Sequence, residues 1–440
     1  MDDEIISWLL EKPPIHIIGG GGVGMSGLAL LMIHLGYEVS ASDLENSVYL
    51  AKIAEAGGET WQGSSPERVK PGAAVFYSSA VPVHDQERKI LSSTGWQVMN
   101  RFLLLKFISS QFFTIAVSGT HGKTTSSAML AVVLEQLGAD PTALIGGTVQ
   151  SWQTHIRLGQ HLNVRKPLLV LEADESDGSF NYIEAKAGII TNIELDHTDR
   201  YSSLEQVEAE FETFARGVQQ SGGQVFLSPG EKINQSISSL ATESASLPEK
   251  VQLSAQGDHN RQNAANVIEI VAWLGYDRDQ AMRIIQKFTG VARRMQLLGK
   301  VIYNNRKIDV IDDYAHHPTE LKAVYEALQD RYERIILVWE PHRPSRINVF
   351  AQEFKDVIEK YYGLPWTLQL PVFAASEERE LAPAEAALSY LKKISKAGEV
   401  LEFCDGNLEE GVDAVVLTAG AGNSSGFAHN LIDTLTERGR

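Results

Sequence analysis

Short apolar runs alternate with stretches of helical periodicity along most of the chain. In the first hundred residues, the runs at 15–18, 37–42 and 74–78 predict strands, and the segments between them have helical spacing. A second series starts near residue 109, where the run FTIAVSG precedes a glycine-containing turn and a long helical segment. Because strands that alternate with helices form parallel sheets, the pattern predicts an α/β protein.

A third series starts near residue 300, where KVIYNNRKIDVIDDYA predicts a hairpin of two strands. Residues 228–258 are polar and rich in serine, so we expect a loop with one short helix there. Three domains are therefore predicted. They are an N-terminal Rossmann-like domain at 1–108, a central domain with the parallel sheet of a P-loop ATPase at 109–298, and a C-terminal Rossmann-like domain at 299–440.

The composition agrees with this organisation. A chain of 440 residues with 43% hydrophobic residues fits two to four domains of roughly 100 to 200 residues each. The formal net charge of -17 argues against nonspecific nucleic-acid binding and against an anionic membrane surface as partner. The single cysteine, Cys404, cannot form an internal disulfide, and the first residues lack the basic region of a signal peptide. We expect a cytoplasmic protein without membrane spans.

The segment VSGTHGKTT, at 117–125, lies between a predicted strand and a predicted long helix. Backbone N–H groups of such a glycine turn, together with the helix N-terminus, surround phosphate oxygens. Lys123 adds a positive charge, and Thr124 adds a hydroxyl for magnesium. The spacing from Gly119 to Thr124 is the short form G-x-x-G-K-T. A glycine turn with an unrelated lysine is the weaker interpretation, because a strand precedes the turn and a helix follows it.

Acidic side chains follow two predicted strands downstream of this loop, at the same expected edge of the sheet. Magnesium usually takes one or two carboxylates together with phosphates and water. An acidic run alone is usually a solvated turn, but two such clusters after a phosphate loop favour a magnesium site. The clusters are Glu172, Asp174, Glu175 and Asp177 after the strand at 168–171, and Asn192, Glu194, Asp196, His197 and Asp199 after the next strand.

Two predicted strands in the C-terminal region also end in polar side chains. The first ends in Asp312 and Asp313, and two histidines and a helix with Pro318 in its first turn follow it. Neighbouring side chains of an extended chain point apart, so these histidines suit substrate contact better than a shared metal. Arginines bind carboxylates in forked geometry, which fits the carboxylate of an amino acid. The second strand is followed by Glu340, His342, Arg343 and Arg346.

The segment from His16 to Asp43 contains a run of four glycines. Gly19, Gly21 and Gly24 have the G-x-G-x-x-G spacing, and Asp43 closes the second strand about 20 residues later. On the residues alone this pattern fits NAD, whose ribose takes the acidic side chain. The pyrophosphate of a UDP-sugar fits the same geometry, so both ligands stay open at this point.

Motifs in all three predicted domains resemble those of the Mur ligase family, and they occur in the family's order. The HHPTE and PHR segments, at 316–320 and 341–343, resemble the members that add L-alanine. The resemblance implies an ATP-dependent ligase that joins L-alanine to the lactyl carboxylate of UDP-N-acetylmuramic acid through an acyl phosphate. The product would serve peptidoglycan synthesis. The motifs are HIIGGGGVGMSG at 16–27, YSSAVP at 77–82, GTHGKTT at 119–125, EADESD at 172–177, NIELDHTD at 192–199, GDHNRQNA at 257–264 and DDYAHHPTE at 312–320.

The resemblance also implies roles for particular residues. The catalytic residues would be Lys123, Glu172, His197, Arg343 and Arg346. Two Mg²⁺ ions would be held, one by Thr124 and Glu172 and one by His197, with Asp174, Glu175 and Asp196 behind these ligands. The residues at ATP would be Gly119, Thr120, His121, Gly122, Lys123, Thr124, Thr125, Asn263 and Arg294. The residues at the UDP-sugar would be Gly19, Gly21, Gly22, Gly24, Met25, Asp43, Ser78 and Ser79. The residues at the amino acid would be Tyr314, His316, His317, His342, Arg343 and Arg346.

The chain departs from the family's usual sequence at several places. Gly20 replaces an isoleucine in the glycine loop, which we expect to make the loop more flexible and UDP-sugar binding weaker. Two alternatives stay open, a ligase that recycles a murein tripeptide and a nucleotide-binding regulator that has lost catalysis. A Rossmann oxidoreductase leaves the phosphate loop unexplained. We expect a monomer or homodimer. The other departures are THIRLG at 154–159, the shortened region at 228–258, Glu340, Pro344, Ser345, Ser376 and GAGNSS at 420–425.

Overall fold

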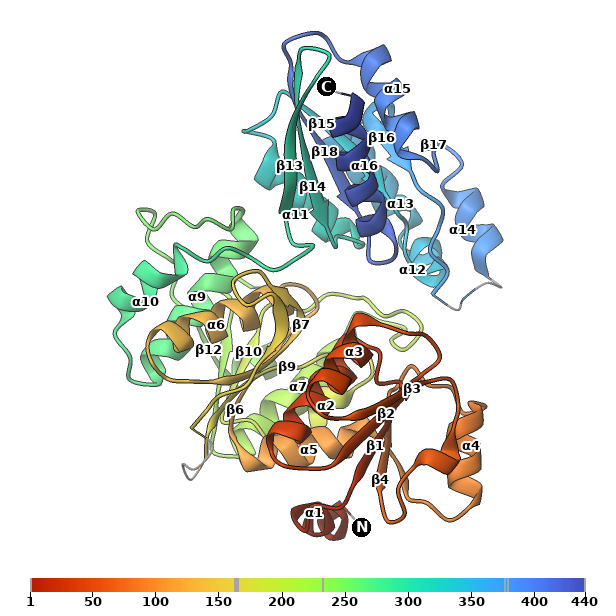
Figure 1. Ribbon diagram of the computed structural model, residues 1–440. Coiled ribbons are helices and arrows are strands. Elements are labelled where there is room, and N and C mark those ends of the chain that lie inside the picture. Colours follow the sequence, from red (N-terminus) through yellow and green to blue (C-terminus); the bar gives the residue numbers. More distant parts are fainter. Residues whose placement is uncertain (1, 162–165, 232, 376, 378–379, 439–440) are drawn as a thin grey trace. The chain divides into compact units, whose positions relative to one another are not determined.

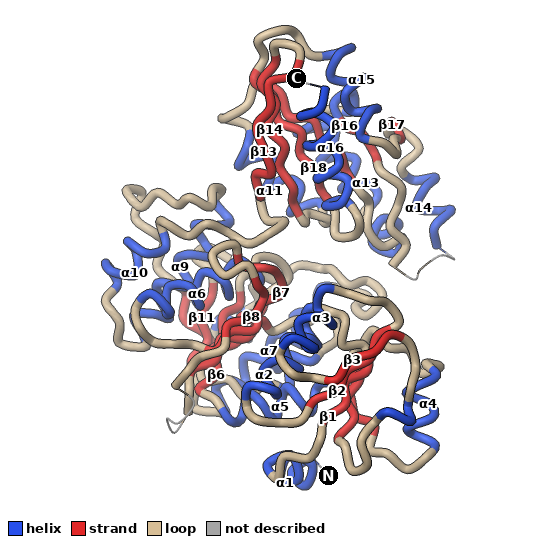
Figure 2. The backbone as a smooth tube through the Cα atoms, in the orientation of Figure 1, coloured by secondary structure: helices blue, strands red, loops and turns tan. Residues whose placement is uncertain are grey.

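The computed structural model describes residues 2–161, 166–231, 233–375, 377 and 380–438. The chain packs as two compact units, of which the first holds two sheets and the second holds one. Figure 2 shows helices beside the strands of each sheet, and the predicted α/β class is confirmed. The first unit comprises Met1–Glu194, Glu205–Val251 and Asn263–Ile285, and the second comprises Leu195–Leu204, Gln252–Gln262 and Gln286–Arg440.

The N-terminal sheet has five parallel strands in the order β3-β2-β1-β4-β5. The strands predicted at 15–18, 37–42 and 74–78 are confirmed as β1, β2 and β4. Figure 1 shows α2 and α5 on one side of this sheet and α4 on the other, and β1 is buried at every position. The elements are α1 (Asp2–Leu10), β1 (Ile15–Ile18), α2 (Val23–His34), β2 (Val39–Asp43), α3 (Val48–Glu55), β3 (Glu59–Gln62), η1 (Pro66–Arg68), β4 (Ala74–Tyr77), α4 (Gln86–Ser93), β5 (Val98–Asn100) and α5 (Arg101–Gln111).

Among the described residues, the central sheet has seven strands in the order β12-β11-β10-β6-β9-β7-β8; the β7–β8 pair is antiparallel, and the other pairs are parallel. The short helix predicted within 228–258 is confirmed as α8, but the region also contains strand β12. The pattern missed β12 because its three residues, ATE, show no apolar alternation and none is buried. The elements are β6 (Phe113–Ser118), α6 (Lys123–Gln136), β7 (Thr142–Val149), β8 (Thr154–Arg157), β9 (Leu168–Glu172), η2 (Ser179–Tyr182), β10 (Ala187–Ile190), α7 (Leu204–Gln220), β11 (Gln224–Leu227), α8 (Gln235–Ser238), β12 (Ala241–Glu243), α9 (Asp258–Trp273) and α10 (Arg278–Ile285).

The C-terminal sheet has six strands in the order β13-β14-β18-β15-β16-β17. The predicted hairpin is confirmed as the antiparallel pair β13–β14, with positive φ at Asn304 and Asn305, as a tight two-residue turn requires. The elements are β13 (Gln296–Tyr303), β14 (Arg306–Asp313), α11 (Pro318–Leu328), β15 (Arg334–Trp339), α12 (Pro344–Val349), α13 (Ala351–Val357), η3 (Ile358–Tyr362), η4 (Leu364–Trp366), β16 (Thr367–Gln369), α14 (Leu381–Ala387), β17 (Lys392–Lys393), α15 (Ala397–Asn407), β18 (Asp413–Ala419) and α16 (Ser424–Arg438).

The core of this last sheet contains the single cysteine. Cys404 on α15 is 0% exposed and packs with Val400, Leu401 and Leu431. Burial raises the pKa of its thiol to about 12. None of the helices in the described ranges is long and apolar enough to cross a membrane. The domain boundaries at 108/109 and 298/299 stay predictions.

Candidate functional site

The phosphate-loop segment connects the end of β6 to the start of α6. Gly119 has a φ of 134°, and a Cβ at this position would lie 1.9 Å from Oγ1 of Thr191. Gly122 has a φ of 83°, and a Cβ there would lie 2.7 Å from Oδ1 of Asn263. Both positions therefore require glycine, because their conformation is left-handed and their surroundings leave no space for a side chain.

The residues that follow β10 hold the phosphate loop in shape. The Asn192 side chain accepts a hydrogen bond from the backbone N of His121 at 2.8 Å and donates one to its carbonyl at 3.0 Å. The Thr120 hydroxyl donates to the Glu194 carbonyl at 3.2 Å and accepts from the Glu194 N at 2.9 Å. The sequence grouped Asn192 and Glu194 with the magnesium site. The Asn192 amide binds the backbone of His121. Glu194 contacts Thr120 through its backbone, so a role of its carboxylate at magnesium stays a prediction.

Lys123 lies in the first turn of α6, and oxygen atoms surround its ammonium group. Nζ donates to the carbonyls of Gly119 at 2.7 Å and Thr120 at 3.1 Å, and to the two carboxylate oxygens of Glu175 at 3.0 and 2.7 Å. Burial by itself lowers the pKa of Lys123, but Glu175 and Asp174 outweigh burial and raise the pKa above its ordinary value. Lys123 is therefore a fixed positive charge at the loop.

Glu172 at the end of β9 lies beside the loop's threonine. The Thr124 hydroxyl donates to Oε1 of Glu172 at 2.8 Å, and the Gly146 N donates to Oε2 at 2.6 Å. Burial raises the pKa of Glu172, and the charge of Lys123 opposes that rise. A hydroxyl and a carboxylate at this separation are oxygen donors of the kind that Mg²⁺ takes. His197, the other predicted ligand, belongs to the second unit, so the two-ion arrangement stays a prediction.

The N-terminal glycine loop borders a pocket of about 220 Å³. The N atoms of Gly19 and Gly20 both donate to the carbonyl of Ser42 at 2.9 Å, and the N of Gly21 donates to Oδ2 of Asp43 at 2.8 Å. These three bonds fasten the loop to β2. The lining residues include the predicted Gly19, Gly22, Asp43 and Ser78, together with Ser42, Ser64, Asp85 and Glu87.

Glu87 on α4 is a buried carboxylate beneath this pocket, and it was missed in the sequence. It is 2% exposed and accepts hydrogen bonds from the Ser42 hydroxyl, the Trp61 Nε1 at 3.3 Å and the Ser65 N at 3.1 Å. Burial raises the pKa of Glu87, but the nearby His16 ring and the hydrogen bond from Ser42 outweigh burial, and the net pKa is lowered. A single glutamate in a polar helix sequence gives no sign that it is buried, so no sequence signal could have identified it.

A second pocket, of about 160 Å³, lies between α2 and the β7–β8 hairpin. It brings Gly24 of the glycine loop together with Glu172, and it contains two residues that the sequence analysis did not select, Arg101 and His155. His155 is 1% exposed, its Nε2 lies 3.1 Å from the Ser26 hydroxyl, and burial lowers its pKa to about 4.

Three predicted UDP-sugar contacts, Gly21, Met25 and Ser79, lie outside both pockets. Met25 is 2% exposed, and its side chain packs in the core of the first unit. Ser79 is exposed and does not line either pocket. The position of a residue within a loop motif does not show whether its side chain faces the cavity, the core or solvent.

In the second compact unit, which includes the segment Leu195–Leu204, Arg346 binds Asp196. Nε lies 2.8 Å from Oδ1 and Nη2 lies 3.1 Å from Oδ2, and both residues are 3% exposed. The sequence assigned these guanidinium nitrogens of Arg346 to the carboxylate of an amino acid. In the structure, the Asp196 carboxylate binds them. Arg343 is more open, with a side chain 32% exposed and Nη1 3.1 Å from Oδ2 of Asp199.

The predicted histidines His316 and His342 lie side by side, with ring centroids 5.8 Å apart. Nδ1 of His316 is 2.8 Å from the Tyr314 carbonyl, and Nδ1 of His342 is 3.3 Å from Nη1 of Arg346. Burial lowers the pKa of His316 to about 3. Burial, together with His316 and Arg346, lowers the pKa of His342 to about 2. Both rings are therefore neutral at pH 7.

The other predicted residues of this unit have structural partners. His317 is 4% exposed and begins α11, where its Nδ1 accepts from the Thr319 N at 3.3 Å. Arg294 lies over the ring of Tyr314 at 5.0 Å, and its Nη1 is 3.4 Å from Oε1 of Glu320.

Glu340, one of the departures, binds the start of α16. Its carboxylate accepts from the N atoms of Gly422 at 3.0 Å, Asn423 at 2.9 Å and Ser424 at 3.1 Å. The side chain is 5% exposed, and burial raises its pKa against the effect of these three bonds. Ser376, another departure, lies outside the described residues.

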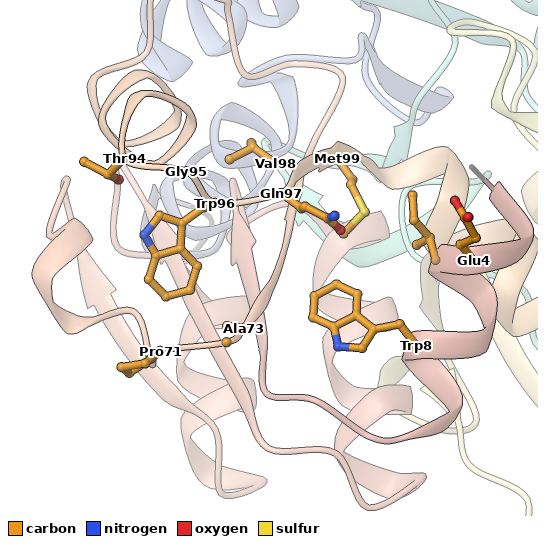
Figure 3. A pocket seen from close by; sticks show the side chains of 12 residues that line it. Glu4, Trp8, Pro71, Ala73, Thr94, Gly95, Trp96, Gln97, Val98 and Met99 are labelled. Atoms are coloured by element: carbon orange, nitrogen blue, oxygen red, sulfur yellow. The ribbon is translucent and has the colours of Figure 1, made fainter.

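A further cavity, of about 900 Å³, lies between α1 and β5 (Figure 3). Trp8 and Trp96 face it from α1 and from the loop before β5, and Met99 closes part of its wall. Its lining, as far as the chain is described, includes no lysine or arginine. It therefore lacks the cations that phosphate groups of ATP or a UDP-sugar would need.

Comparison with known protein families gives three matches that follow one another along the chain. They are the Mur ligase family catalytic domain at residues 14–113, the Mur ligase middle domain at 117–272 and the Mur ligase glutamate ligase domain at 293–423. The chain belongs to the Mur ligase family, as the motifs predicted.

Two of the similar proteins are named UDP-N-acetylmuramate–L-alanine ligase. The UDP-N-acetylmuramate–L-alanine ligase of Rubrobacter xylanophilus is 36% identical over 77% of this chain and 80% of its own length. The ligase of the same name from Hydrogenobaculum is 31% identical over 95% and 98%. The crystal structure of the corresponding Thermotoga maritima ligase has a TM-score of 0.73 at 24% identity and covers 97% of this chain and 99% of its own. A murein peptide ligase from Psychrobacter arcticus has the same fold, with a TM-score of 0.67 at 21% identity over 96% and 99%.

Proposed function

We propose that this protein joins L-alanine to the lactyl carboxylate of UDP-N-acetylmuramic acid in peptidoglycan synthesis, with ATP converted to ADP and phosphate. The observation that carries the proposal is the match, over 95% of the chain, to a relative named for this reaction. The phosphate loop with its fixed Lys123 supports it, because the family uses ATP. We also propose that the protein acts in the cytoplasm as a monomer or homodimer.

The reaction has two bond-forming steps. A lactyl carboxylate oxygen attacks the γ-phosphorus of ATP, and the bond from that phosphorus to the β-γ bridging oxygen breaks to release ADP. The amine of L-alanine then attacks the acyl carbon, and phosphate leaves. Lys123 and the backbone N–H groups from Gly119 to Thr124 would stabilise the charge on the transferring phosphoryl group.

Thr124 and Glu172 would hold one Mg²⁺, and His197 would contribute to a second ion. When bound, Mg²⁺ neutralises phosphate and carboxylate charge. The Thr124–Glu172 pair fits such an ion because both donors are oxygen atoms beside the phosphate loop.

The C-terminal residues would bind the amino acid. Arg343 is the better candidate for the alanine carboxylate, since its guanidinium is partly exposed while Asp196 occupies the fork of Arg346. His342 would act as a neutral hydrogen-bonding group. Its pKa of about 2 makes it too weak a base to hold the ammonium proton of alanine at neutral pH.

The test is phosphate release from ATP and Mg²⁺ in the presence of UDP-N-acetylmuramic acid, with L-alanine, L-serine, glycine or the recycling tripeptide as acceptor. Release that requires both UDP-N-acetylmuramic acid and L-alanine supports the proposal. Preference for the tripeptide would replace it with the recycling ligase, and no release with any acceptor would favour a regulator. Lys123→Met serves as the inactive control.

A further inference from the structure

We infer that Arg101 binds an anionic group of the UDP-sugar through its Nη1. The identity of the ligand rests on the proposed function, whereas the role of Arg101 rests on its own geometry. Arg101 is the first residue of α5 and lines the pocket between α2 and the β7–β8 hairpin. No motif in the sequence marks it, because a single arginine at the start of a helix is usually a surface charge.

Two neighbours fix the orientation of the Arg101 guanidinium. Nε donates to Oδ2 of Asp177 at 3.0 Å, Nη2 lies 2.7 Å from the same oxygen, and Nη2 also donates to the Ser179 hydroxyl at 3.2 Å. The side chain is only 15% exposed. Because these anchors leave the planar group little freedom, its third nitrogen is preorganised, and binding costs less side-chain entropy.

The third nitrogen, Nη1, lies next to the glycine loop. A Cβ built on Gly24, the last glycine of the loop, would be 3.3 Å from Nη1. Within the described ranges of the chain, Nη1 has no hydrogen-bond acceptor. Gly24 is in the first turn of α2, whose N-terminal amides favour anions. A fixed guanidinium and a helix N-terminus therefore face the same space.

The charges of the pocket make this arginine necessary for an anionic ligand. Its lining carries the carboxylates of Glu172 and Asp174, and His155 is neutral at pH 7 because its pKa is about 4. Arg101 is the residue of this lining that carries a positive charge. At about 160 Å³, the pocket is smaller than the roughly 300 Å³ and more of whole-ligand sites, so it fits part of a nucleotide sugar.

Two groups of UDP-N-acetylmuramic acid have the required chemistry. The pyrophosphate would lie at the glycine loop, and the lactyl carboxylate would lie nearer Glu172. Both offer anionic oxygens that accept hydrogen bonds from a guanidinium. Binding experiments can distinguish them, because UDP has only the first group and UDP-N-acetylglucosamine lacks the second.

The experiment is calorimetric titration of the full chain with UDP, UDP-N-acetylglucosamine and UDP-N-acetylmuramic acid. The variants are Arg101→Met, Arg101→Lys and the control Arg68→Met, which removes an exposed arginine that pairs with Glu59. We expect Arg101→Met to weaken UDP-N-acetylmuramic acid binding at least tenfold and Arg68→Met to leave it unchanged. An equal loss for all three ligands assigns Arg101 to the pyrophosphate. A loss confined to UDP-N-acetylmuramic acid assigns it to the carboxylate.

Asp177→Asn separates binding from structural support, since it removes the anchor and keeps the arginine. We expect it to weaken binding less than Arg101→Met at a similar change in melting temperature. If the two variants lose the same amount of affinity for UDP-N-acetylmuramic acid, or if Arg101→Met binds it as tightly as the wild type, the inference is overturned and the proposed function is not affected. A wild-type chain that binds none of the three ligands would overturn the proposed function together with the inference.

Discussion

Arg346 and Asp196 form a two-point ion pair, with Nε 2.8 Å from Oδ1 and Nη2 3.1 Å from Oδ2. An arginine fork that already holds a carboxylate of the protein cannot hold the carboxylate of an amino acid in the same way. The pair instead fixes α12, which follows Arg343 directly in the chain. Arg346 thereby supports the neighbouring Arg343, whose side chain is 32% exposed.

Asp196→Ala leaves the Arg346 charge buried without its partner. We expect a loss of about 3–5 kcal/mol in the free energy of unfolding, measured by chemical denaturation at pH 7. The double variant Asp196→Leu/Arg346→Met removes both charges and should recover most of that loss. An Asp196→Ala variant as stable as the wild type would contradict a stabilising pair.

The same pair has a defined pH dependence. Burial raises the pKa of Asp196, but Arg346 outweighs burial and holds the pKa well below its ordinary value. A lowered carboxyl pKa contributes stability that is present above the unfolded-state value of about 3.9 and is lost as the pH falls through the folded value. Acid titration of the wild type and of the double variant measures this contribution.

Glu340→Ala removes the acceptor for three backbone N–H groups at the start of α16. Loss of a helix N-cap usually costs about 0.5–2 kcal/mol, and the negative charge at the N-terminus adds to the effect. We expect Glu340→Ala to lie at the upper end of this range and Glu340→Gln, which keeps an acceptor but loses the charge, to lie below it. Thermal unfolding measures both, and Glu409→Ala is the control because Glu409 is exposed. Equal stability of Glu340→Ala and the control would rule out the cap.

Gly20→Ala tests how firmly the glycine loop is held. A Cβ at Gly20 would lie 2.8 Å from Cβ of Ala41, a separation that forces the backbone to shift. Overpacking of this kind typically costs about 1–3 kcal/mol, and Ala41→Gly in the same chain should restore part of it. The measurement is the melting temperature of the two variants. A Gly20→Ala variant without any loss would mean that the loop can move away from β2.

The histidines of the C-terminal unit should not titrate near neutral pH. Because the pKa values of His316 and His342 are about 3 and 2, their ring resonances should stay constant between pH 5 and 8 in NMR spectra of histidine-labelled protein. The reference is the unfolded chain, whose histidines titrate near 6.5. Below about pH 6.5 the unfolded state binds protons at these two histidines and the folded state does not, so the two groups reduce the free energy of unfolding as the pH falls. A titration of either ring at pH 6 would contradict the burial of that ring.

The sequence predicted the elements whose signal is local. The apolar run of β1, the hairpin of β13 and β14 with its Asn304–Asn305 turn, and the strand, loop and helix around Lys123 each lie within about 25 consecutive residues. β12 has no such signal and was missed.

Contacts between distant residues could not be predicted in the same way. Arg101 and Asp177 are 76 residues apart in the chain, and Asp196 and Arg346 are 150 apart. A motif assigns a chemical type to Arg346 but does not show that Asp196 already occupies it. The same limit applies to Asn192, whose amide was assigned to the magnesium site and instead binds the backbone of His121.

The burial of Cys404 makes the natural chain unreactive toward thiol reagents. A thiol with 0% exposure and a pKa of about 12 is almost entirely protonated and inaccessible at pH 7. A cysteine introduced on the surface of either compact unit would thus be the only site that maleimide dyes modify. The protein can be labelled at chosen pairs of positions without first removing its own cysteine, and fluorescence energy transfer between the dyes would then report the distance between the two units with and without nucleotide.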